Sequence, residues 1–341
     1  MRLRHSDIHG PGYGRVRSGR GFRYVDRHGR TLDDADEKAR IKALAIPPAW
    51  TDVWVCPFPN GHIQAVGFDA AGRRQYLYHP EFRRRQEQSK HEHVAEVAAT
   101  LPRLRDRVEH DLRRRGLCRS RVLACAVRLL DLGLFRVGDR GYTRDNDSYG
   151  LTTLLREHAS VRQGRISFEY PGKSGRTQVT EVADEATRKA VRALLRRRDP
   201  GPRLLAYWEG GTWHEVAGSE LNAYLCEASG TEMSAKDFRT WHATVMAAVG
   251  LAVSANRADD GTGPRRRAVA RTVREVADYL GNTPTVCRAS YIDPRVVELF
   301  EDGVTVAPAL PELGADSPAG LPATRGAMED AVRELLHRRP D

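Results

Sequence analysis

The first part of the chain alternates short apolar runs with turn-forming residues. β-forming side chains gather in three segments, which are residues 21–25, 53–55 and 63–66. Groups such as Pro59-Asn60-Gly61 separate these segments, and such groups favour turns. The polar stretch 83–90 that follows predicts a linker. We therefore expect residues 1–90 to form a small antiparallel β domain with short helices.

A further strand is predicted over residues 73–78, just before the polar stretch. Successive side chains of a strand point to opposite faces. Gln75 and Leu77 are therefore expected on one face, with Tyr76 and Tyr78 on the other. The two tyrosines are either packing residues or groups that a ligand contacts.

From residue 91 the apolar positions recur every three or four residues, which is the spacing of an amphipathic helix. Pro102 is expected to bend the first helix, and Ser120 to begin a second one that ends at about residue 132. Ile166, Phe168 and Tyr170 alternate before a turn at residues 171–175 and predict a hairpin. Further helices are predicted at about 184–198, 219–229, 235–252, 264–280 and 284–300.

These patterns predict an α+β protein in which residues 91–303 form a mostly helical domain with one β-hairpin. Residues 305–323 hold four prolines among small residues and predict a flexible linker. A short final helix is predicted at about 326–337. Residues 304–341 are therefore expected to be a flexible tail that ends in this helix.

Charge adds a candidate partner to this outline. The 341 residues carry a formal net charge of +10, and residues 1–90 hold 17 Lys and Arg against 10 Asp and Glu. Such a basic protein favours a polyanion, with nucleic acid as the first candidate. No apolar run approaches the ~20 residues that a membrane span needs, and the first residues lack an apolar signal core. A cytoplasmic protein without membrane contact is predicted.

Several familiar cofactor motifs are incomplete. The five cysteines form no Cys-x-x-Cys pair, so neither zinc nor a disulfide framework is expected. Gly172-Lys173-Ser174 lacks the glycine that a phosphate loop needs five residues earlier, where Ser167 stands. We find no dinucleotide fingerprint and no metal-binding motif. No cofactor and no metal are predicted.

Four residues are candidates for chemistry, although each alone has an ordinary explanation. Lys173 lies in a tight turn of a chain in which only six of the 55 basic residues are lysine, and lysine can release a proton where arginine cannot. A turn lysine is more often a solvated surface charge. In a chain so rich in arginine, Arg136 and Arg239 are more often surface residues or phosphate anchors than catalysts, and Tyr291 is expected as a half-buried helix residue.

Taken in order, these residues lie in motifs that resemble the type IB DNA topoisomerases, in their short bacterial and poxvirus-like form. The motifs are Phe135-Arg136-Val137-Gly138, the hairpin Gly172-Lys173, Lys236-x-x-Arg239-Thr240 and Ser290-Tyr291-Ile292-Asp293-Pro294. Residues 145–154 resemble the family segment that follows the first arginine, and residues 75–78 the family's DNA-contacting strand. The resemblance extends from about residue 12 to 302.

The resemblance implies a role for each catalytic candidate. Tyr291 attacks a DNA phosphodiester and forms a 3′-phosphotyrosyl enzyme. Arg136 and Arg239 bracket the non-bridging oxygens, and Lys173 protonates the leaving 5′-oxygen. Asn282 stands where most relatives carry histidine. Its neutral amide still donates a hydrogen bond to a non-bridging oxygen but relays no proton.

The resemblance also implies how DNA is bound. Gln75, Tyr76, Tyr78 and Tyr142 are the expected DNA contacts. Two positive domains would close around a duplex as a clamp, in a monomer that needs no protein partner, ATP or metal, and that associates with a bacterial nucleoid. DNA supercoils would relax while one strand is transiently nicked.

Two alternatives remain at this point. A tyrosine recombinase uses the same Arg–Lys–Arg–Tyr chemistry, but recombinases usually carry His-x-x-Arg, where this chain has Lys236 three residues before Arg239. Recombinases also usually have a helical N-terminal domain, whereas residues 1–80 predict β structure. A non-catalytic DNA-binding protein would explain the charge but not the ordered motifs.

Overall fold

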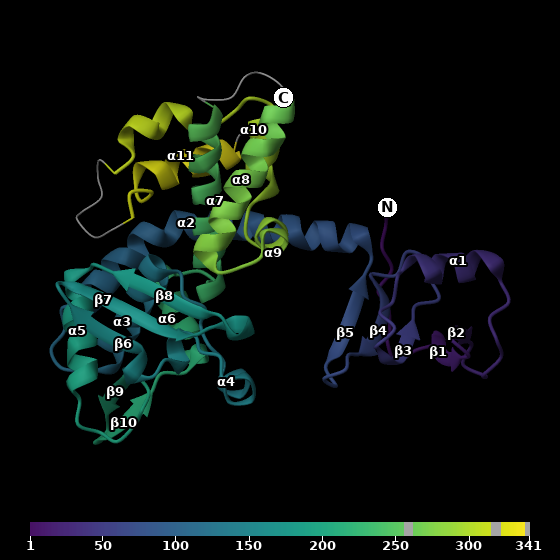
Figure 1. Cartoon of the computed structure of the whole chain (residues 1–341), viewed down its shortest axis with the longest axis horizontal. Coiled ribbons are helices and arrows are strands. Elements are labelled where there is room, and N and C mark those ends of the chain that lie inside the picture. Colours follow the sequence, from purple (N-terminus) through teal and green to yellow (C-terminus); the bar gives the residue numbers. More distant parts are fainter. Residues whose placement is uncertain (256–261, 315–321, 338–341) are drawn as a thin grey trace. The chain divides into compact units, whose positions relative to one another are not determined.

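The computed structural model describes residues 1–255, 262–314 and 322–337, and its chain divides into two compact units, Met1–Lys90 and His91–Asp341 (Figure 1). The boundary between the units falls within one long helix, α2 (Pro80–Leu112). Among the described residues, we find no helix with the length and apolar character that a membrane crossing requires.

The first unit is built on an antiparallel sheet with the strand order β2-β1-β3-β4-β5. A small core forms on this sheet around Ile41, Val55 and Ala65, and the helix α1 (Ala35–Ala43) contributes Ile41 to it. The predicted β character of this region is confirmed. The strands are β1 (Tyr13–Ser18), β2 (Gly21–Val25), β3 (Thr51–Val55), β4 (Ile63–Phe68) and β5 (Arg74–Tyr78).

The prediction of a linker at residues 83–90 is wrong, because these residues belong to α2. Pro80 begins this helix, at a position where its missing N–H costs nothing. Glu81 then pairs with Arg84 and Arg85, three and four residues further on, at the spacings that bring side chains together on a helix. The polar run is therefore a solvated helix face. The helix also continues through Pro102, which does not end it.

The second unit is mostly helical, as predicted, and it surrounds the almost completely buried helix α3 (Arg119–Gly133). A three-stranded antiparallel sheet, β6-β7-β8, and the helix α5 pack against α3 (Figure 1). The remaining elements are α4 (Arg140–Asn146), β6 (Ala159–Arg162), β7 (Arg165–Pro171), β8 (Thr177–Val182), α5 (Glu185–Arg196), β9 (Ala206–Glu209), β10 (Thr212–Glu215), α6 (Gly218–Ser229), α7 (Ala235–Ala255) and α8 (Thr262–Leu280).

The single helix predicted at 284–300 is in fact two helices, α9 (Pro284–Ser290) and α10 (Pro294–Glu301). A residue before proline is disfavoured in the helical conformation, so Pro294 prevents Asp293 from continuing α9. Asp293 instead caps α10, since its Oδ1 accepts a hydrogen bond from the Arg295 N–H at 2.9 Å. Tyr291 consequently stands at a break between helices.

The last helix, α11 (Ala327–His337), forms where it was predicted, but it is not part of a flexible tail. Met328, Val332 and Leu336 are buried in the same core as α3 and α7. Glu329 is buried as well, and it pairs with Arg105 and accepts a hydrogen bond from the Trp241 indole N–H at 3.2 Å. This helix is therefore an integral part of the second unit. Residues 315–321 of the predicted linker lie outside the described residues.

Candidate active site

Arg136 lies just beyond the end of α3 and reaches across to the end of α8. Leu134 ends α3 in the left-handed conformation, with φ of 50°. The Arg136 guanidinium then donates hydrogen bonds to the Gly281 carbonyl oxygen, at 3.0 Å, and to the Asn282 Oδ1. Two segments that are about 145 residues apart in the sequence are thereby joined.

The end of α8 presents Gly281 and Asn282 to Arg136 in a defined turn. Gly281 has φ of +61°, and the Asn282 N–H donates to the Ala277 carbonyl oxygen at 2.9 Å. This is the Schellman arrangement, in which glycine follows the last helical residue. Within the described structure, the Asn282 Nδ2 is buried and has no hydrogen-bond partner. Its oxygen orients Arg136, and its nitrogen is available for an acceptor that enters the site.

Arg239 lies on α7 and is 5% exposed. Its guanidinium donates to the Leu134 carbonyl oxygen and, at 2.8 Å, to the Leu280 carbonyl oxygen. Burial lowers the pKa of Arg239, and the positive charge of Arg136 lowers this pKa further. Two cations that are held close together in a poorly hydrated place are stabilised by an anion between them. The site is therefore suited to a phosphate group.

Tyr291 adjoins this pair of arginines. The centroid of its ring lies 5.4 Å from the Arg239 Cζ, and the side chain is half-buried. Its backbone N–H donates to the Cys287 carbonyl oxygen at 3.0 Å, at the end of α9. The structure thus brings Tyr291, Arg239, Arg136 and Asn282 into one neighbourhood.

Lys173 is exposed in the turn between β7 and β8. It lines a cavity of about 350 Å³ together with Arg136 and the segments 137–139 and 148–150. Gly150 packs so closely against Gly138 that a Cβ at Gly150 would lie 2.4 Å from the Gly138 nitrogen. The Leu151 N–H also donates to the Arg136 carbonyl oxygen at 2.7 Å. The segment noted in the sequence at 145–154 therefore braces the backbone of Arg136.

One residue near the site was missed by the sequence reasoning. Tyr170 on β7 is 6% exposed, and burial raises its pKa to about 12, although Arg239 and Arg136 oppose this shift. Its ring stacks on Phe135, the residue before Arg136. The alternating pattern had placed Tyr170 in the hairpin but carried no signal of its closeness to the two arginines.

The expected DNA contacts lie in the first unit. Tyr76 and Tyr78 share one face of β5, as predicted, with their rings stacked at 5.9 Å and both partly exposed. Tyr78 also stacks on Phe82 at 5.4 Å. Gln75 differs, because its Nε2 donates to the Asp69 Oδ2 at 2.9 Å. The side chain of Tyr142 lies outside the described part of the structure.

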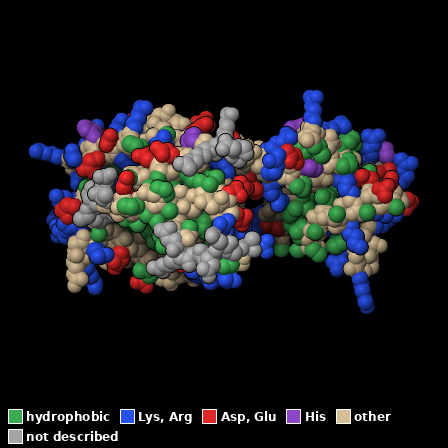
Figure 2. All heavy atoms as spheres, turned by 90° about the horizontal axis from the view of Figure 1, so that it is seen from above, with side chains coloured by type: hydrophobic (Ala, Val, Ile, Leu, Met, Phe, Trp, Pro, Cys, Tyr) green, Lys and Arg blue, Asp and Glu red, His purple; other side chains and the backbone are tan. Residues whose placement is uncertain are grey.

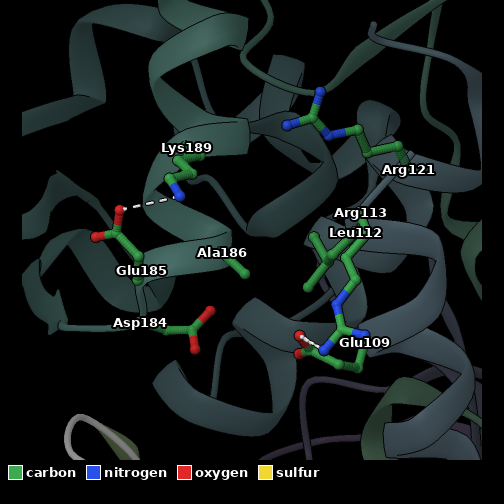
Figure 3. A pocket seen from close by; sticks show the side chains of 8 residues that line it. All are labelled: Glu109, Leu112, Arg113, Arg121, Asp184, Glu185, Ala186 and Lys189. Carbon is green, nitrogen blue, oxygen red and sulfur yellow. Dashed lines mark hydrogen bonds and ion pairs between the residues drawn. The ribbon is translucent and has the colours of Figure 1, made fainter. Parts of the chain in front are cut away.

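A second cavity in the helical unit, of about 490 Å³, contains none of the candidates (Figure 3). Four of its charged side chains form two ion pairs, Lys189 with Glu185 at 3.5 Å and Arg113 with Glu109 at 3.1 Å. Over the wider surface, blue Lys and Arg side chains stand among red Asp and Glu on both units (Figure 2). In the described residues we find no cluster of His, Cys, Asp and Glu that would hold a metal ion.

Comparison with known families decides the assignment. The family model of the eukaryotic DNA topoisomerase I catalytic core matches residues 79–304, which is more than half of the chain. The chain belongs to the type IB DNA topoisomerases. A model of the bacterial DNA topoisomerase IB N-terminal domain also matches, at residues 21–69. The resemblance seen in the sequence is therefore confirmed, as is the α+β fold, and a tyrosine recombinase is not favoured.

Individual relatives agree with this assignment. A DNA topoisomerase 1B of Acanthamoeba polyphaga mimivirus is 29% identical over 77% of this chain and 80% of its own length. The DNA topoisomerase 1B of vaccinia virus (strain Copenhagen) is 21% identical over 70% of this chain and 72% of its own. A DNA topoisomerase 1 of rabbit fibroma virus is 23% identical over 76% of this chain and 80% of its own length. Type IB topoisomerases relax DNA, and this chain is an enzyme of that class.

Proposed function

We propose that this topoisomerase relaxes supercoiled duplex DNA by transesterification at Tyr291. The observation that carries the proposal is the convergence of the Tyr291 ring with the buried guanidinium of Arg239, beside Arg136 and Asn282. The phenol oxygen attacks the phosphorus and forms a 3′-phosphotyrosyl bond, while the bond from phosphorus to the 5′-oxygen breaks. The phenol proton passes to water. One strand is then open, and the duplex rotates until the 5′-hydroxyl attacks again.

The two arginines supply the charge that this reaction needs. A phosphodiester repels a nucleophile, and negative charge grows on the equatorial oxygens as the bond forms. Guanidinium groups grip such oxygens through a planar fork of N–H donors. Arg239 is fixed by two backbone carbonyls and Arg136 by Gly281 and Asn282, so neither needs to reorganise during the reaction.

Lys173 is proposed as the general acid. Its Nζ gives a proton to the 5′-oxygen as that oxygen leaves, and it takes the proton back when the strand is rejoined. The proposal is supported by its place in the cavity that Arg136 also lines. An alkoxide is a poor leaving group, and general acids contribute typically ~10²–10⁴-fold to such steps.

Asn282 is proposed to do two things at once. Its Oδ1 accepts from Arg136 and so orients that guanidinium. Its buried, unpartnered Nδ2 is then the donor to a non-bridging phosphate oxygen. An amide can fill both roles because it carries an acceptor and a donor side by side. This gives a physical reason why asparagine serves where a histidine was expected.

No nucleotide or metal enters this scheme. The phosphotyrosyl bond replaces one phosphodiester with another ester, so its energy is kept for resealing. The arginines supply the positive charge that neutralises the phosphate, so the scheme calls for no metal ion. We further propose that Tyr76 and Tyr78 contact the duplex, that the two units close around it as a clamp, and that the enzyme acts as a monomer on nucleoid DNA in a bacterium.

Plasmid relaxation tests the proposal. The purified protein should relax negatively supercoiled plasmid in EDTA without ATP, and denaturation during the reaction should trap a covalent protein–DNA adduct. Peptide mapping should place this adduct on Tyr291. The matched control is Tyr291→Phe, which keeps the ring and removes the nucleophilic oxygen. Relaxation by this variant at the normal rate, or an adduct on another residue, would overturn the proposal.

A further inference from the structure

The backbone around Tyr291 needs partners from outside its own helix. The Tyr291 and Ile292 N–H groups both donate to the Cys287 carbonyl oxygen, and these bonds close α9. The last carbonyl oxygens of a helix accept no N–H from that helix, and the first N–H groups of the next helix likewise find no partner within it. The Tyr291 carbonyl and the Asp293 N–H therefore depend on a neighbouring element.

One side chain of α7 lies against both of these groups. The Thr244 Oγ1 accepts a hydrogen bond from the Asp293 N–H at 3.1 Å and lies 3.2 Å from the Tyr291 carbonyl oxygen, to which it donates. The same hydroxyl lies 2.9 Å from the carbonyl oxygen of Thr240, one turn earlier on its own helix. The hydroxyl proton of Thr244 is shared between the Thr240 and Tyr291 carbonyl oxygens, and its oxygen accepts from the Asp293 N–H.

Thr244 also links the nucleophile to the catalytic cation. It stands five residues after Arg239 on α7, so both side chains belong to one rigid element. Thr244 is only 1% exposed, so bulk water does not reach its hydroxyl. The hydroxyl thus holds the turn at residues 291–293 at a set position relative to the helix that carries Arg239.

We propose that Thr244 is a positioning residue for Tyr291, which keeps the phenol oxygen aligned with a phosphate held by Arg239. This inference rests on the proposed function. The turn has other anchors for its stability, because Ile292 is buried in the core. Asp293 also pairs with Arg295, which donates to the Leu336 carbonyl oxygen of α11 at 3.2 Å. Loss of the Thr244 hydroxyl should therefore disturb alignment more than folding.

The test compares two replacements of Thr244. Thr244→Val keeps the shape and removes the hydroxyl, whereas Thr244→Ser keeps the hydroxyl. A misplacement of about 1 Å can lower a rate by about 10²-fold. We expect Thr244→Val to slow single-turnover DNA cleavage by about 10- to 100-fold and to leave the Kd for DNA unchanged. Thr244→Ser should cleave at close to the rate of the parent enzyme.

A matched control comes from Thr272 on α8. This threonine is also buried, at 2% exposure, but its Oγ1 has no hydrogen-bond partner among the described residues. Thr272→Val should leave cleavage and DNA affinity unchanged and should not lower the Tm, because the hydroxyl that it removes is unsatisfied. Should Thr244→Val prove unstable, Thr244→Cys replaces it, since a thiol is only a weak donor. That variant should slow cleavage to a rate between those of the Ser and Val variants.

The outcomes separate this inference from the proposed function. Cleavage by Thr244→Val at the rate of the parent enzyme would overturn the positioning role, even when Tyr291→Phe is inactive. An equal loss in Thr244→Val and Thr272→Val would overturn it too, because the effect would then reflect packing alone. An active Tyr291→Phe variant would instead refute the proposed function itself.

Discussion

The site arginines of the helical unit, Arg239 above all, and the stacked tyrosines of the β unit are held in different ways. Arg239 is 5% exposed and bound by two backbone carbonyls, whereas Tyr76 and Tyr78 are 36% and 38% exposed and held by ring contacts. Chemistry needs charges that are already in place, because reorganisation would add to the barrier. A binding surface must be exposed before DNA arrives, because the contacts that bury its side chains are those made with the duplex. Changes at the arginine site should therefore affect the rate of cleavage, and changes at the two tyrosines should affect the affinity for DNA.

Among the residues that assist Tyr291, the largest effect is expected at Lys173. Lys173→Ala should lower the cleavage rate by about 10²–10⁴-fold, because the 5′-oxygen then leaves without a proton. DNA in which sulfur replaces the scissile 5′-oxygen should largely restore the rate, since a thiolate leaves readily. Single-turnover cleavage of both substrates measures this. Equal damage on both would remove Lys173 from the role of general acid.

A similar but smaller loss is expected at Arg239. Arg239→Lys keeps the charge but loses the planar fork, so one of the two anchored carbonyls and one phosphate contact are lost. Removal of a fixed donor costs about 10²–10³-fold in rate. The Kd for DNA should change little. A large change in the Kd for DNA with a normal rate of cleavage would show that Arg239 serves binding and not catalysis.

Asn282 sharpens the comparison, because it supports a catalytic group and also contacts the phosphate. Asn282→His should preserve or raise cleavage, since a neutral imidazole accepts from Arg136 with one nitrogen and donates with the other. Asn282→Leu removes both functions and should slow cleavage by at least about tenfold, because even one hydrogen bond to a charged group is worth about 1.5–3 kcal/mol. Both rates are measured at single turnover. Complete loss in Asn282→His would contradict this role.

The smallest effect is expected at Tyr78, in the exposed region. Tyr78→Ala should weaken DNA binding by less than about tenfold, by analogy with a lost base or phosphate contact worth about 1 kcal/mol. The rate of cleavage at saturating protein should not change. A salt titration of Kd serves as the control, because its slope reports phosphate contacts made by the cations, at about −0.9 for each. A lower rate of cleavage by Tyr78→Ala at saturating protein would contradict the distinction between the arginine site and the tyrosine surface.

Local patterns predicted much of the fold. The strand at 21–25 and the hairpin with its turn at 171–175 were predicted from alternation, and most helices from apolar spacing. The failures have physical causes. The polar run 83–90 showed no apolar period, so its helix is visible only through the pairing of Glu81 with Arg84 and Arg85. Pro294 signals the break between α9 and α10. The prediction of one helix at 284–300 followed the continuing apolar pattern instead of the proline.

By itself, the sequence determined the family, the order of the motifs and the identity of the candidates Arg136, Lys173, Arg239 and Tyr291. Only the tertiary structure decided that Asn282 accepts from Arg136, 146 residues away, and that Thr244 meets the backbone of Tyr291, 47 residues away. The reason is that local spacing governs which element forms. Contacts between distant elements depend on how α3, α7, α8 and α9 pack around one core, and no short-range pattern records that packing.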